Sequence, residues 1–262
     1  MSLLAASNLT KRYRRGGKTV IAVDDVSFHI EPGETLALAG PSGSGKSTIA
    51  RLALRLIEPD AGRIEFEGGD FLALRGATLR ARRARLQMVF QDPLAAFNPR
   101  ATVARALDDP LRIHGIASRG ERPRRIAELL ERVGLPADLA SRAVHEISGG
   151  QRQRVAIARA IATKPSLIVL DEAVSALDVS VRGQILELLL DLQREQKIAY
   201  LFISHDLGVV RAVAHRIILL DAGRIAESGE ARAVVDAPRS AIGKALVAAA
   251  PRLDRSIRHN AP

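Results

Sequence analysis

The stretch Gly40-Pro41-Ser42-Gly43-Ser44-Gly45-Lys46-Ser47 lies between an apolar run at Thr35–Ala39 and a helical pattern over residues 47–56. It matches G-x-x-x-x-G-K-[ST], a loop whose glycines let successive backbone N–H groups wrap a phosphate chain. The helix that follows adds the partial positive charge of its N-terminus. Lys46 is expected to reach the β- and γ-phosphates of a nucleotide, and the Ser47 hydroxyl to ligate Mg²⁺. A chance glycine-rich turn is the alternative, but the strand before the loop and the helix after it favour a phosphate site.

The segments around this loop alternate between short apolar runs and helical patterns. Strands are predicted at residues 63–67, 87–90, 167–170, 200–204, 216–221 and 224–227, and helices at 79–85, 149–162, 180–195 and 206–214. This alternation favours an α/β fold with a mostly parallel sheet covered on both faces. The first 40 residues differ, with strands predicted at 3–11, 20–24 and 26–30, and residues 102–145 have the pattern of an inserted helical subdomain.

Composition limits the chemistry that the chain can perform. Its 262 residues include no cysteine, which excludes disulfides, cysteine-ligated zinc, iron–sulfur clusters and thiol catalysis. Lys and Arg number 39 against 29 Asp and Glu, so the formal net charge is +10. That excess fits either an anionic partner or an arginine-rich surface that keeps the protein soluble. With two Tyr, six Phe and no Trp, the chain has few side chains on which single-stranded nucleic acid can stack.

No membrane-spanning segment is expected. The longest apolar runs, such as residues 167–170 and 217–220, have the length of strands, whereas a bilayer needs roughly 20 residues. Residues 1–10 lack the basic and apolar regions of a signal peptide. A role at a membrane would therefore need other subunits to cross it.

Two acids follow one of the predicted buried strands. Leu167-Ile168-Val169-Leu170-Asp171-Glu172 is apolar until its last two residues. Because the carboxyl ends of parallel strands face the ligand crevice, both acids are expected near the phosphates. Asp171 is expected to hold Mg²⁺ through its water shell, and Glu172 to orient and polarise the attacking water. A pair of acids that caps a helix is the alternative.

A second anion site is predicted where Ser148-Gly149-Gly150-Gln151 opens the helix at 149–162. Backbone N–H groups, a hydroxyl and the end of a helix dipole meet there. The phosphate loop already holds one nucleotide, so a second such loop indicates that it serves the nucleotide of another chain. A helix capped by its serine is the simpler interpretation.

Several motifs stand in one order along the chain: the phosphate loop, Gln91 after an apolar strand, Ser148-Gly149-Gly150-Gln151, Asp171-Glu172, Ser175-Ala176-Leu177-Asp178, and His205 after the strand at 200–204. Because all of these motifs occur together and in this order, the chain resembles an ATP-binding subunit of an ABC transporter over residues 3–251. The resemblance implies a nucleotide-binding domain at residues 1–251, in which a P-loop NTPase core with a mostly parallel sheet carries an antiparallel β subdomain and the helical subdomain. Residues 252–262 would form a basic C-terminal tail.

The resemblance also implies roles for single residues. Tyr13 would stack on adenine, although an edge-strand aromatic is the alternative. Gln91 would touch Mg²⁺ or the lytic water and couple the site to the transmembrane subunits. His205 would hydrogen-bond the γ-phosphate and steady Glu172, although a histidine at a strand end is often structural. Asp178 would lie at the interface of two such domains. The implied catalytic residues are Glu172, His205 and Gln91; the residues implied to bind ATP are Tyr13, Gly40, Pro41, Ser42, Gly43, Ser44, Gly45, Lys46, Ser47, Thr48, Ser148, Gly149, Gly150, Gln151 and Asp178; those implied to bind Mg²⁺ are Ser47, Gln91 and Asp171.

The partners follow from the same resemblance. Two ATPase subunits, identical or paralogous, would sandwich two ATP molecules head to tail and close when ATP bridges them. They would act on two transmembrane permease subunits at the cytoplasmic face of a bacterial inner membrane, supplied by an extracytoplasmic solute-binding protein. Residues 90–100 resemble a segment of the ATPases of dipeptide, oligopeptide and nickel importers, as does the stretch 237–251. The cysteine tail of many relatives is absent, and Ala173 stands where many have Pro, as in the nickel-import branch.

Two functions other than transport are compatible with some of these motifs. A soluble ABC ATPase of DNA repair or translation would use the basic charge to bind nucleic acid. Against a repair ATPase, the 148 − 46 = 102 positions between Lys46 and Ser148 leave no room for a long coiled-coil arm. Against a translation ATPase, which needs two phosphate loops in one chain, this sequence has one. A regulatory nucleotide binder without catalysis would not need both Glu172 and His205. The basic segment at residues 80–85 fits a solvated helix face or contact with anionic headgroups.

Overall fold

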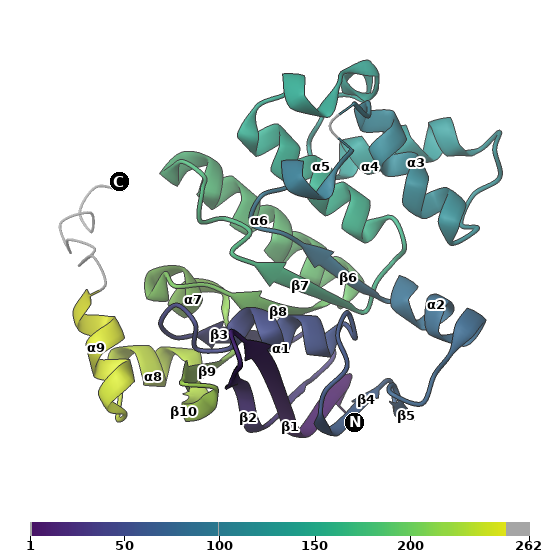
Figure 1. Ribbon diagram of the computed structural model, residues 1–262. Helices are drawn as coiled ribbons and strands as arrows, with labels where there is room; N and C mark the ends of the chain where they lie inside the picture. The colour runs from purple at the N-terminus through teal and green to yellow at the C-terminus, as the bar shows by residue number, and fades with distance from the viewer. Residues whose placement is uncertain (1, 99, 250–262) are drawn as a thin grey trace, which may run out of the picture.

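A six-stranded sheet with the strand order β10-β9-β3-β8-β7-β6 crosses the middle of Figure 1. The computed structural model describes residues 2–98 and 100–249. Neighbouring strands from β9 to β6 pair in parallel, and β10 pairs antiparallel with β9 at one edge. Their bounds are β3 (Thr35–Ala39), β6 (Leu86–Val89), β7 (Leu167–Asp171), β8 (Ala199–Ile203), β9 (Arg216–Asp221) and β10 (Arg224–Glu230). The predicted α/β class with a mostly parallel sheet is confirmed.

Strand β3 illustrates why the sheet forms. All five of its residues are buried. Successive side chains point to opposite faces, so Leu36 and Leu38 enter one hydrophobic core while Ala37 and Ala39 enter another. A strand buried on both faces has no polar positions, which explains the continuous apolar run in the sequence.

A second, antiparallel sheet has the order β2-β1-β4-β5 and packs below the first in Figure 1. It comprises β1 (Leu4–Arg15), β2 (Lys18–Ile30), β4 (Ala61–Phe66) and β5 (Gly69–Asp70). The prediction of separate strands at 20–24 and 26–30 was wrong, because β2 continues through Asp25, whose φ of 57° lies beside a register shift against β1. A local irregularity of this kind interrupts the alternation of side chains without ending the strand.

Helices cover both faces of the large sheet, and the helical lobe, residues 102–145, lies at the top of Figure 1. The helices are α1 (Lys46–Ala53), α2 (Gly76–Ala84), α3 (Val103–Ile113), α4 (Arg122–Arg132), α5 (Gly149–Ile161), α6 (Val179–Gln196), α7 (Leu207–Val213), α8 (Ala231–Asp236) and α9 (Ala241–Ala249), with 3₁₀ turns at Leu94–Ala96, Ala137–Ser141 and Val144–Glu146. Leu107 of α3 and Leu130 of α4 share one hydrophobic core with Leu170 and Phe202 of the sheet. The lobe therefore packs onto the sheet without a boundary between separate cores.

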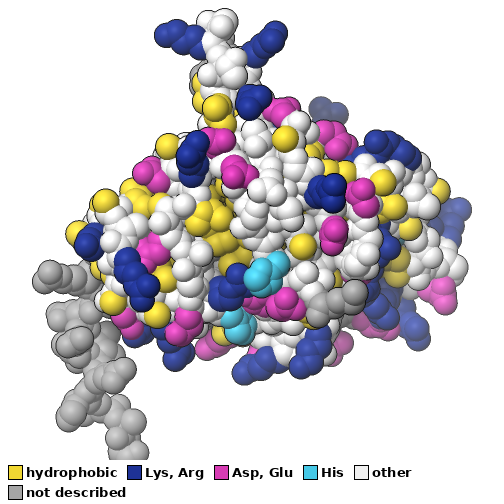
Figure 2. Space-filling view, turned by 90° about the horizontal axis from the view of Figure 1, so that it is seen from below, with side chains coloured by type: hydrophobic (Ala, Val, Ile, Leu, Met, Phe, Trp, Pro, Cys, Tyr) yellow, Lys and Arg dark blue, Asp and Glu magenta, His cyan; other side chains and the backbone are white. Residues whose placement is uncertain are grey.

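Charged side chains of both signs are spread over the face of the molecule that Figure 2 draws. On the face of Figure 2, the side chains of Lys and Arg are intermingled with those of Asp and Glu. Many charged side chains of the described residues form ion pairs, such as Arg211 with Asp236 at 2.7 Å and Arg224 with Asp24 at 2.6 Å. That face gives no single basic patch for a polyanion. Among the described helices, none combines the length and apolar character needed to span a bilayer, and the predicted basic tail at 252–262 lies outside the described residues.

Candidate nucleotide site

The phosphate loop leaves the C-terminal end of β3 and enters α1, in the order that the motif predicts. Two of its glycines are required by the close approach of other backbone segments. A Cβ atom at Gly40 would lie 2.3 Å from the Leu220 carbonyl oxygen, and one at Gly45 would lie 2.4 Å from that of Ala22. Gly45 also has a φ of 107°, which side chains other than glycine rarely adopt. The loop is thus held in a shape that only this glycine pattern allows.

Lys46 opens α1 and is buried at the floor of this loop. Its ammonium donates hydrogen bonds to the carbonyl oxygens of Gly40 at 2.9 Å and Pro41 at 2.8 Å. Burial lowers the pKa of the Lys46 ammonium, while the charges of Glu172 and Asp171 act in the opposite direction. Lys46 therefore interacts electrostatically with Glu172 and Asp171, as expected of residues that share one phosphate site.

Asp171 is the last residue of β7 and lies at the carboxyl edge of the sheet. Burial raises the pKa of the Asp171 carboxyl, and the adjacent charge of Glu172 raises it further against the opposing charges of Arg51 and Lys46. A partly buried carboxylate with a second acid next to it is stabilised in its charged form by a cation beside it. The alternative of an acidic helix cap is not what the structure contains here, because α6 begins only at Val179.

Glu172 turns the chain sharply away from the sheet. Its φ is 49°, a left-handed value that is unfavourable for a residue with a side chain. Its amide donates to the Ile203 carbonyl oxygen at 3.0 Å, and its own carbonyl accepts from the Ser175 hydroxyl at 2.9 Å. The carboxylate is 3.6 Å from Nδ1 of His205 and remains partly exposed. The structure therefore brings Glu172 and His205 together at the end of neighbouring strands β7 and β8.

Asp206 is a supporting residue that sequence reasoning missed. Its carboxylate caps α7 by accepting from the amides of Gly208 at 2.9 Å and Val209 at 3.1 Å. The same carboxylate accepts from Arg182 of α6 at 3.0 Å. These contacts fix the chain directly after His205. An aspartate immediately before a helical pattern is an N-cap signal that the sequence already carried. Arg51 was missed as well, and no local pattern marks its effect on Asp171.

Gln91 lies on the loop after β6 and lines a cavity of about 310 Å³. Gly149 at the start of α5 and Ala173, the neighbour of Glu172, line the same cavity. Gln153 also lines it; this side chain is buried, and its amide nitrogen has no hydrogen-bond partner among the described residues. The cavity therefore joins the predicted coupling residue to the catalytic turn and to the second glycine loop.

Ser148 to Gln151 form the helix cap that was the simpler interpretation of this motif. The Ser148 hydroxyl accepts from the Gln151 amide at 3.2 Å, and the Gln151 side chain accepts from the Ser148 amide at 3.0 Å. A Cβ at Gly150 would lie 2.8 Å from a methyl of Val181, whereas nothing lies within 4 Å of one at Gly149. Among the described residues, no hydrogen bond or ion pair joins this loop to the phosphate loop, and the helix end is preformed and exposed at Ser148 and Gly149.

Two further predicted residues lie on exposed surfaces. Asp178 precedes α6, where its side chain makes no capping hydrogen bond, and the adjacent Val179 is 83% exposed. Tyr13 is 37% exposed on β1 and pairs with Val20 of β2, two residues before Ala22, whose carbonyl lies under Gly45. The Lys11 ammonium sits 5.9 Å from the centre of the Tyr13 ring. Tyr13 is thus partly exposed on the pair of strands whose Ala22 carbonyl approaches the phosphate loop.

The oxygen donors predicted for Mg²⁺ fit that ion in kind. Ser47 offers a hydroxyl, Gln91 an amide and Asp171 a carboxylate, and hard oxygen donors are what Mg²⁺ prefers. Within residues 2–98 and 100–249 no group of three or more His, Cys, Asp or Glu side chains could form a complete metal cage. Mg²⁺ is ordinarily held by one or two carboxylates together with substrate phosphates and water, so the sparse donor set agrees with this ion.

A surface groove of about 470 Å³ runs beside the loop that carries Gln91; we call it the α2 groove. Its lining includes Leu54 and Leu56 after α1, residues of α2, and Phe90 and Phe97. Leu56 is 53% and Phe90 is 42% exposed. Large apolar side chains that line an open groove mark a contact surface for a partner.

Comparison with known proteins assigns the family. The family described as ABC transporter matches residues 23–175. The chain is 51% identical to the glutathione import ATP-binding protein GsiA of Salmonella paratyphi A over 94% of its own length and 40% of that protein, so it spans less than half of that relative. It is 49% identical to the probable peptide ABC transporter ATP-binding protein y4tS of Sinorhizobium fredii, covering 95% of this chain and 73% of that one. The dimeric ATP-binding cassette MJ0796 in a post-hydrolysis state bound to ADP and Pi superposes with a TM-score of 0.79 at 32% identity, covering 87% of this chain and 99% of that one. The chain therefore belongs to the ABC transporter family and has the fold of its ATP-binding cassettes.

Proposed function

We propose that the chain binds and hydrolyses ATP as the motor subunit of an importer. The observation that carries this proposal is the meeting of Lys46, Asp171 and Glu172 at the carboxyl edge of a parallel sheet, with His205 3.6 Å from the Glu172 carboxylate. Phosphoryl transfer needs little more than positioned charge and an oriented water, and these groups supply both. A regulatory nucleotide binder would not need the strained turn that aims Glu172.

In this mechanism each residue has a defined task. Lys46 turns its charge from the loop carbonyls to the β- and γ-phosphates, and the loop amides cradle the phosphate chain. Glu172 accepts a hydrogen bond from the attacking water, and His205 steadies Glu172 and donates to the γ-phosphate. Ser47, Gln91 and Asp171 would hold Mg²⁺, which neutralises charge on the phosphates when bound. Tyr13 stacks on the adenine ring and so holds the base next to the phosphate loop.

We further propose that two such domains sandwich two nucleotides head to tail. The capped and exposed helix end at Ser148, the open position at Gly149 and the exposed Asp178 support this arrangement. Gln151 completes the cap, and Thr48 follows Ser47 at the start of the helix that faces the phosphates. MJ0796 was obtained as a dimer, which supports pairing of cassettes with this fold. The unit that pairs would be residues 1–251, with residues 102–145 as its helical subdomain and 252–262 as a tail.

Permease subunits are the proposed partners at the α2 groove. The groove adjoins Gln91, and its exposed Leu56 and Phe90 suit an apolar segment of another protein. The chain would then sit at the cytoplasmic face of an inner membrane, and an extracytoplasmic solute-binding protein would deliver the cargo. The names of the relatives favour small peptides such as glutathione over nickel as that cargo. The mixed charge of the face in Figure 2 does not support the nucleic-acid alternative.

One experiment separates transport from nucleic-acid work. The full chain is isolated from its native membrane with whatever subunits remain bound, and ATP hydrolysis is measured with added solute-binding protein and glutathione, and separately with single- and double-stranded DNA and RNA. Transport predicts co-isolated permeases and stimulation by the loaded binding protein alone. Stimulation by nucleic acid with no membrane subunit in the preparation would refute the proposal. A lone copy that stays monomeric and hydrolyses ATP at the full rate would refute the composite site.

A further inference from the structure

Helix α1, which begins at the phosphate loop, ends in an unusual way. The Leu56 amide donates to the Arg51 carbonyl and the Arg55 amide to the Leu52 carbonyl, both at 2.8 Å. This is the Schellman pattern, in which the residue with left-handed backbone is ordinarily glycine. Here that residue is Arg55, with a φ of 50°. A side chain at this position is unfavourable for the backbone, so its contacts must offset that cost.

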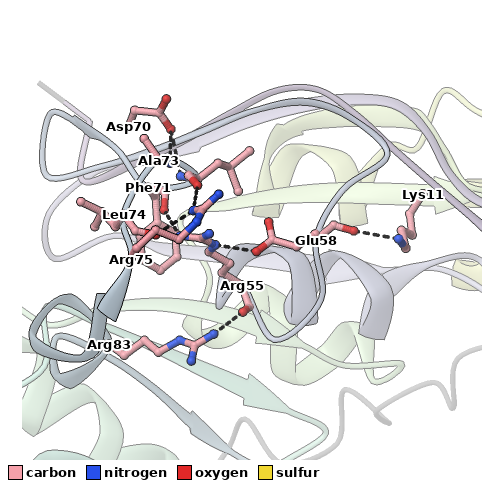
Figure 3. A network of polar contacts seen from close by, with 10 residues as sticks. Lys11, Arg55, Glu58, Asp70, Phe71, Ala73, Leu74, Arg75 and Arg83 are labelled. Carbon is pink, nitrogen blue, oxygen red and sulfur yellow. Dashed lines mark hydrogen bonds and ion pairs between the residues drawn. The ribbon is translucent and has the colours of Figure 1, made fainter. Parts of the chain in front are cut away.

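The Arg55 side chain is almost entirely buried and makes three hydrogen bonds away from its own helix. Its guanidinium donates to the carbonyl oxygens of Phe71 at 2.7 Å and Leu74 at 2.8 Å, and to the Glu58 carboxylate at 2.9 Å. It also lies 6.0 Å from the centre of the Phe71 ring. Figure 3 shows Arg55 at the centre of this network, between the end of α1 and the loop that leads into α2.

The contact is made from both sides. Arg83 of α2 donates back to the Arg55 carbonyl oxygen at 2.6 Å. Lys11 of β1, whose ammonium faces the Tyr13 ring, donates to the Glu58 carbonyl oxygen at 2.7 Å. The segment after α1 is therefore tied to the strand that carries the proposed base contact, to α2 through Arg83, and to the loop before α2 through Arg55.

This network adjoins the α2 groove. Leu54 and Leu56, the neighbours of Arg55 in sequence, line the groove together with Leu79 and Arg83 of α2. The opposite end of α1 carries Lys46 and Ser47. One short helix thus runs from the phosphate loop to the groove, and a buried guanidinium joins its far end to the loop that leads into α2.

We propose that Arg55 is a positioning residue that couples the phosphate-loop helix to α2, so that nucleotide binding changes the α2 groove. The inference rests on the proposed function, because it requires a nucleotide at one end of α1 and a partner surface at the other. A purely structural Arg55 would lower the stability of the chain when replaced. A coupling Arg55 would also be needed for the response of α2 to nucleotide.

Hydrogen exchange measured by mass spectrometry on the full chain distinguishes these roles. Exchange is followed in residues 40–53 and 76–84 without nucleotide and with saturating MgATP, in the wild type and in Arg55→Met, Arg55→Lys and Arg83→Met. Methionine keeps the apolar stem and the same backbone cost but none of the hydrogen bonds. Arg75→Met is the matched control, because Arg75 donates to the same Leu74 carbonyl, at 2.7 Å, from within the loop and does not reach α1.

The wild type is expected to show slower exchange in both segments with MgATP, by about threefold or more in α2. Arg55→Met keeps the protection of residues 40–53 and loses that of α2, Arg55→Lys restores part of it, and Arg75→Met behaves as the wild type. Should Arg55→Met not fold, Arg83→Met, which removes the hydrogen bond from α2, must show the same selective loss. Unchanged α2 protection in folded Arg55→Met or Arg83→Met overturns the inference. No protection of residues 40–53 in the wild type contradicts the proposed function itself.

Discussion

Replacement of Glu172 by glutamine tests the centre of the proposed mechanism. The turn that positions Glu172 is held by its backbone, through the Ile203 carbonyl at 3.0 Å and the amide and hydroxyl of Ser175 at 3.1 and 2.9 Å. Its carboxylate makes one described contact, 3.6 Å from His205. An isosteric amide therefore leaves the turn in place, and we expect the melting temperature of Glu172→Gln to match that of the wild type.

The expected loss is one of chemistry. A positioned general base contributes about 10²–10⁴-fold to rate, equivalent to about 2.7–5.4 kcal/mol of barrier at 1.36 kcal/mol per tenfold. Nucleotide binding should survive, and its magnesium dependence should strengthen. The Glu172 charge raises the pKa of Asp171, so removing that charge lets Asp171 ionise more readily beside a divalent cation.

The assay is ATP hydrolysis at saturating MgATP, in the isolated chain and in the complex with its permeases, together with the apparent mass of the protein in MgATP. Glu187→Gln is the control, because Glu187 is an exposed glutamate of α6 far along the helix from the catalytic turn. We expect Glu172→Gln to accumulate as a nucleotide-bound dimer with little turnover. Hydrolysis within about threefold of the wild type would remove Glu172 from the role of activating water, since a general base contributes far more than that.

Four further changes test other parts of the structure by thermal or chemical unfolding and by nucleotide titration. Gly150→Ala should destabilise the chain by about 1–3 kcal/mol because the new Cβ would lie 2.8 Å from a methyl group of Val181. Val181→Ala should relieve that loss in the double variant. If the two substitutions change the free energy of unfolding additively, the contact is contradicted. Gly149→Ala, one residue away in open space, should instead stabilise the helix by about 0.5–1 kcal/mol. Asp171→Asn should abolish the magnesium-dependent part of nucleotide binding yet stabilise the empty protein at neutral pH. The pKa of Asp171 is raised in the folded chain, so above pH 3.8 the folded chain binds more protons than the unfolded chain. The free energy of unfolding of the wild type should therefore rise as the pH falls towards 3.8. If Asp171→Asn shows the same dependence of unfolding free energy on pH as the wild type, the assignment is refuted. Tyr13→Ala should weaken ATP binding by about 1–3 kcal/mol, with no change for a triphosphate that lacks a base; equal loss for both ligands would exclude stacking.

Much of the fold could be predicted from local patterns because burial on two faces leaves no polar position in a strand. The apolar runs at Thr35–Ala39 and Leu167–Asp171 are such strands, and their edges coincide with the predicted limits to within one residue. The phosphate loop was predictable because its residues form one contiguous motif between a strand and a helix. The structure adds the reason for two of its glycines, since backbone atoms of Leu220 and Ala22 lie too close to Gly40 and Gly45 for any side chain.

What escaped prediction depends on contacts between distant segments. Arg55 follows a helical pattern with nothing in its neighbourhood to mark it as buried, since its acceptors at Phe71 and Leu74 lie 16 and 19 residues away. The two-residue strand β5 has too few positions to show alternation. The left-handed turn at Glu172 runs against the preference of its residue type, which is where local rules are expected to fail at a functional site.

The single hydrophobic core shared by the helical lobe and the large sheet limits how the lobe can move. Leu107 and Leu130 of the lobe belong to the same hydrophobic core as Leu170 and Phe202, so a hinge that opened between them would expose buried apolar side chains to water. Any tilt during a catalytic cycle has to proceed by shear, with side chains sliding by small steps against one another. Compressing or cooling the protein should therefore slow such a cycle more than lengthening the loops at either end of the lobe would.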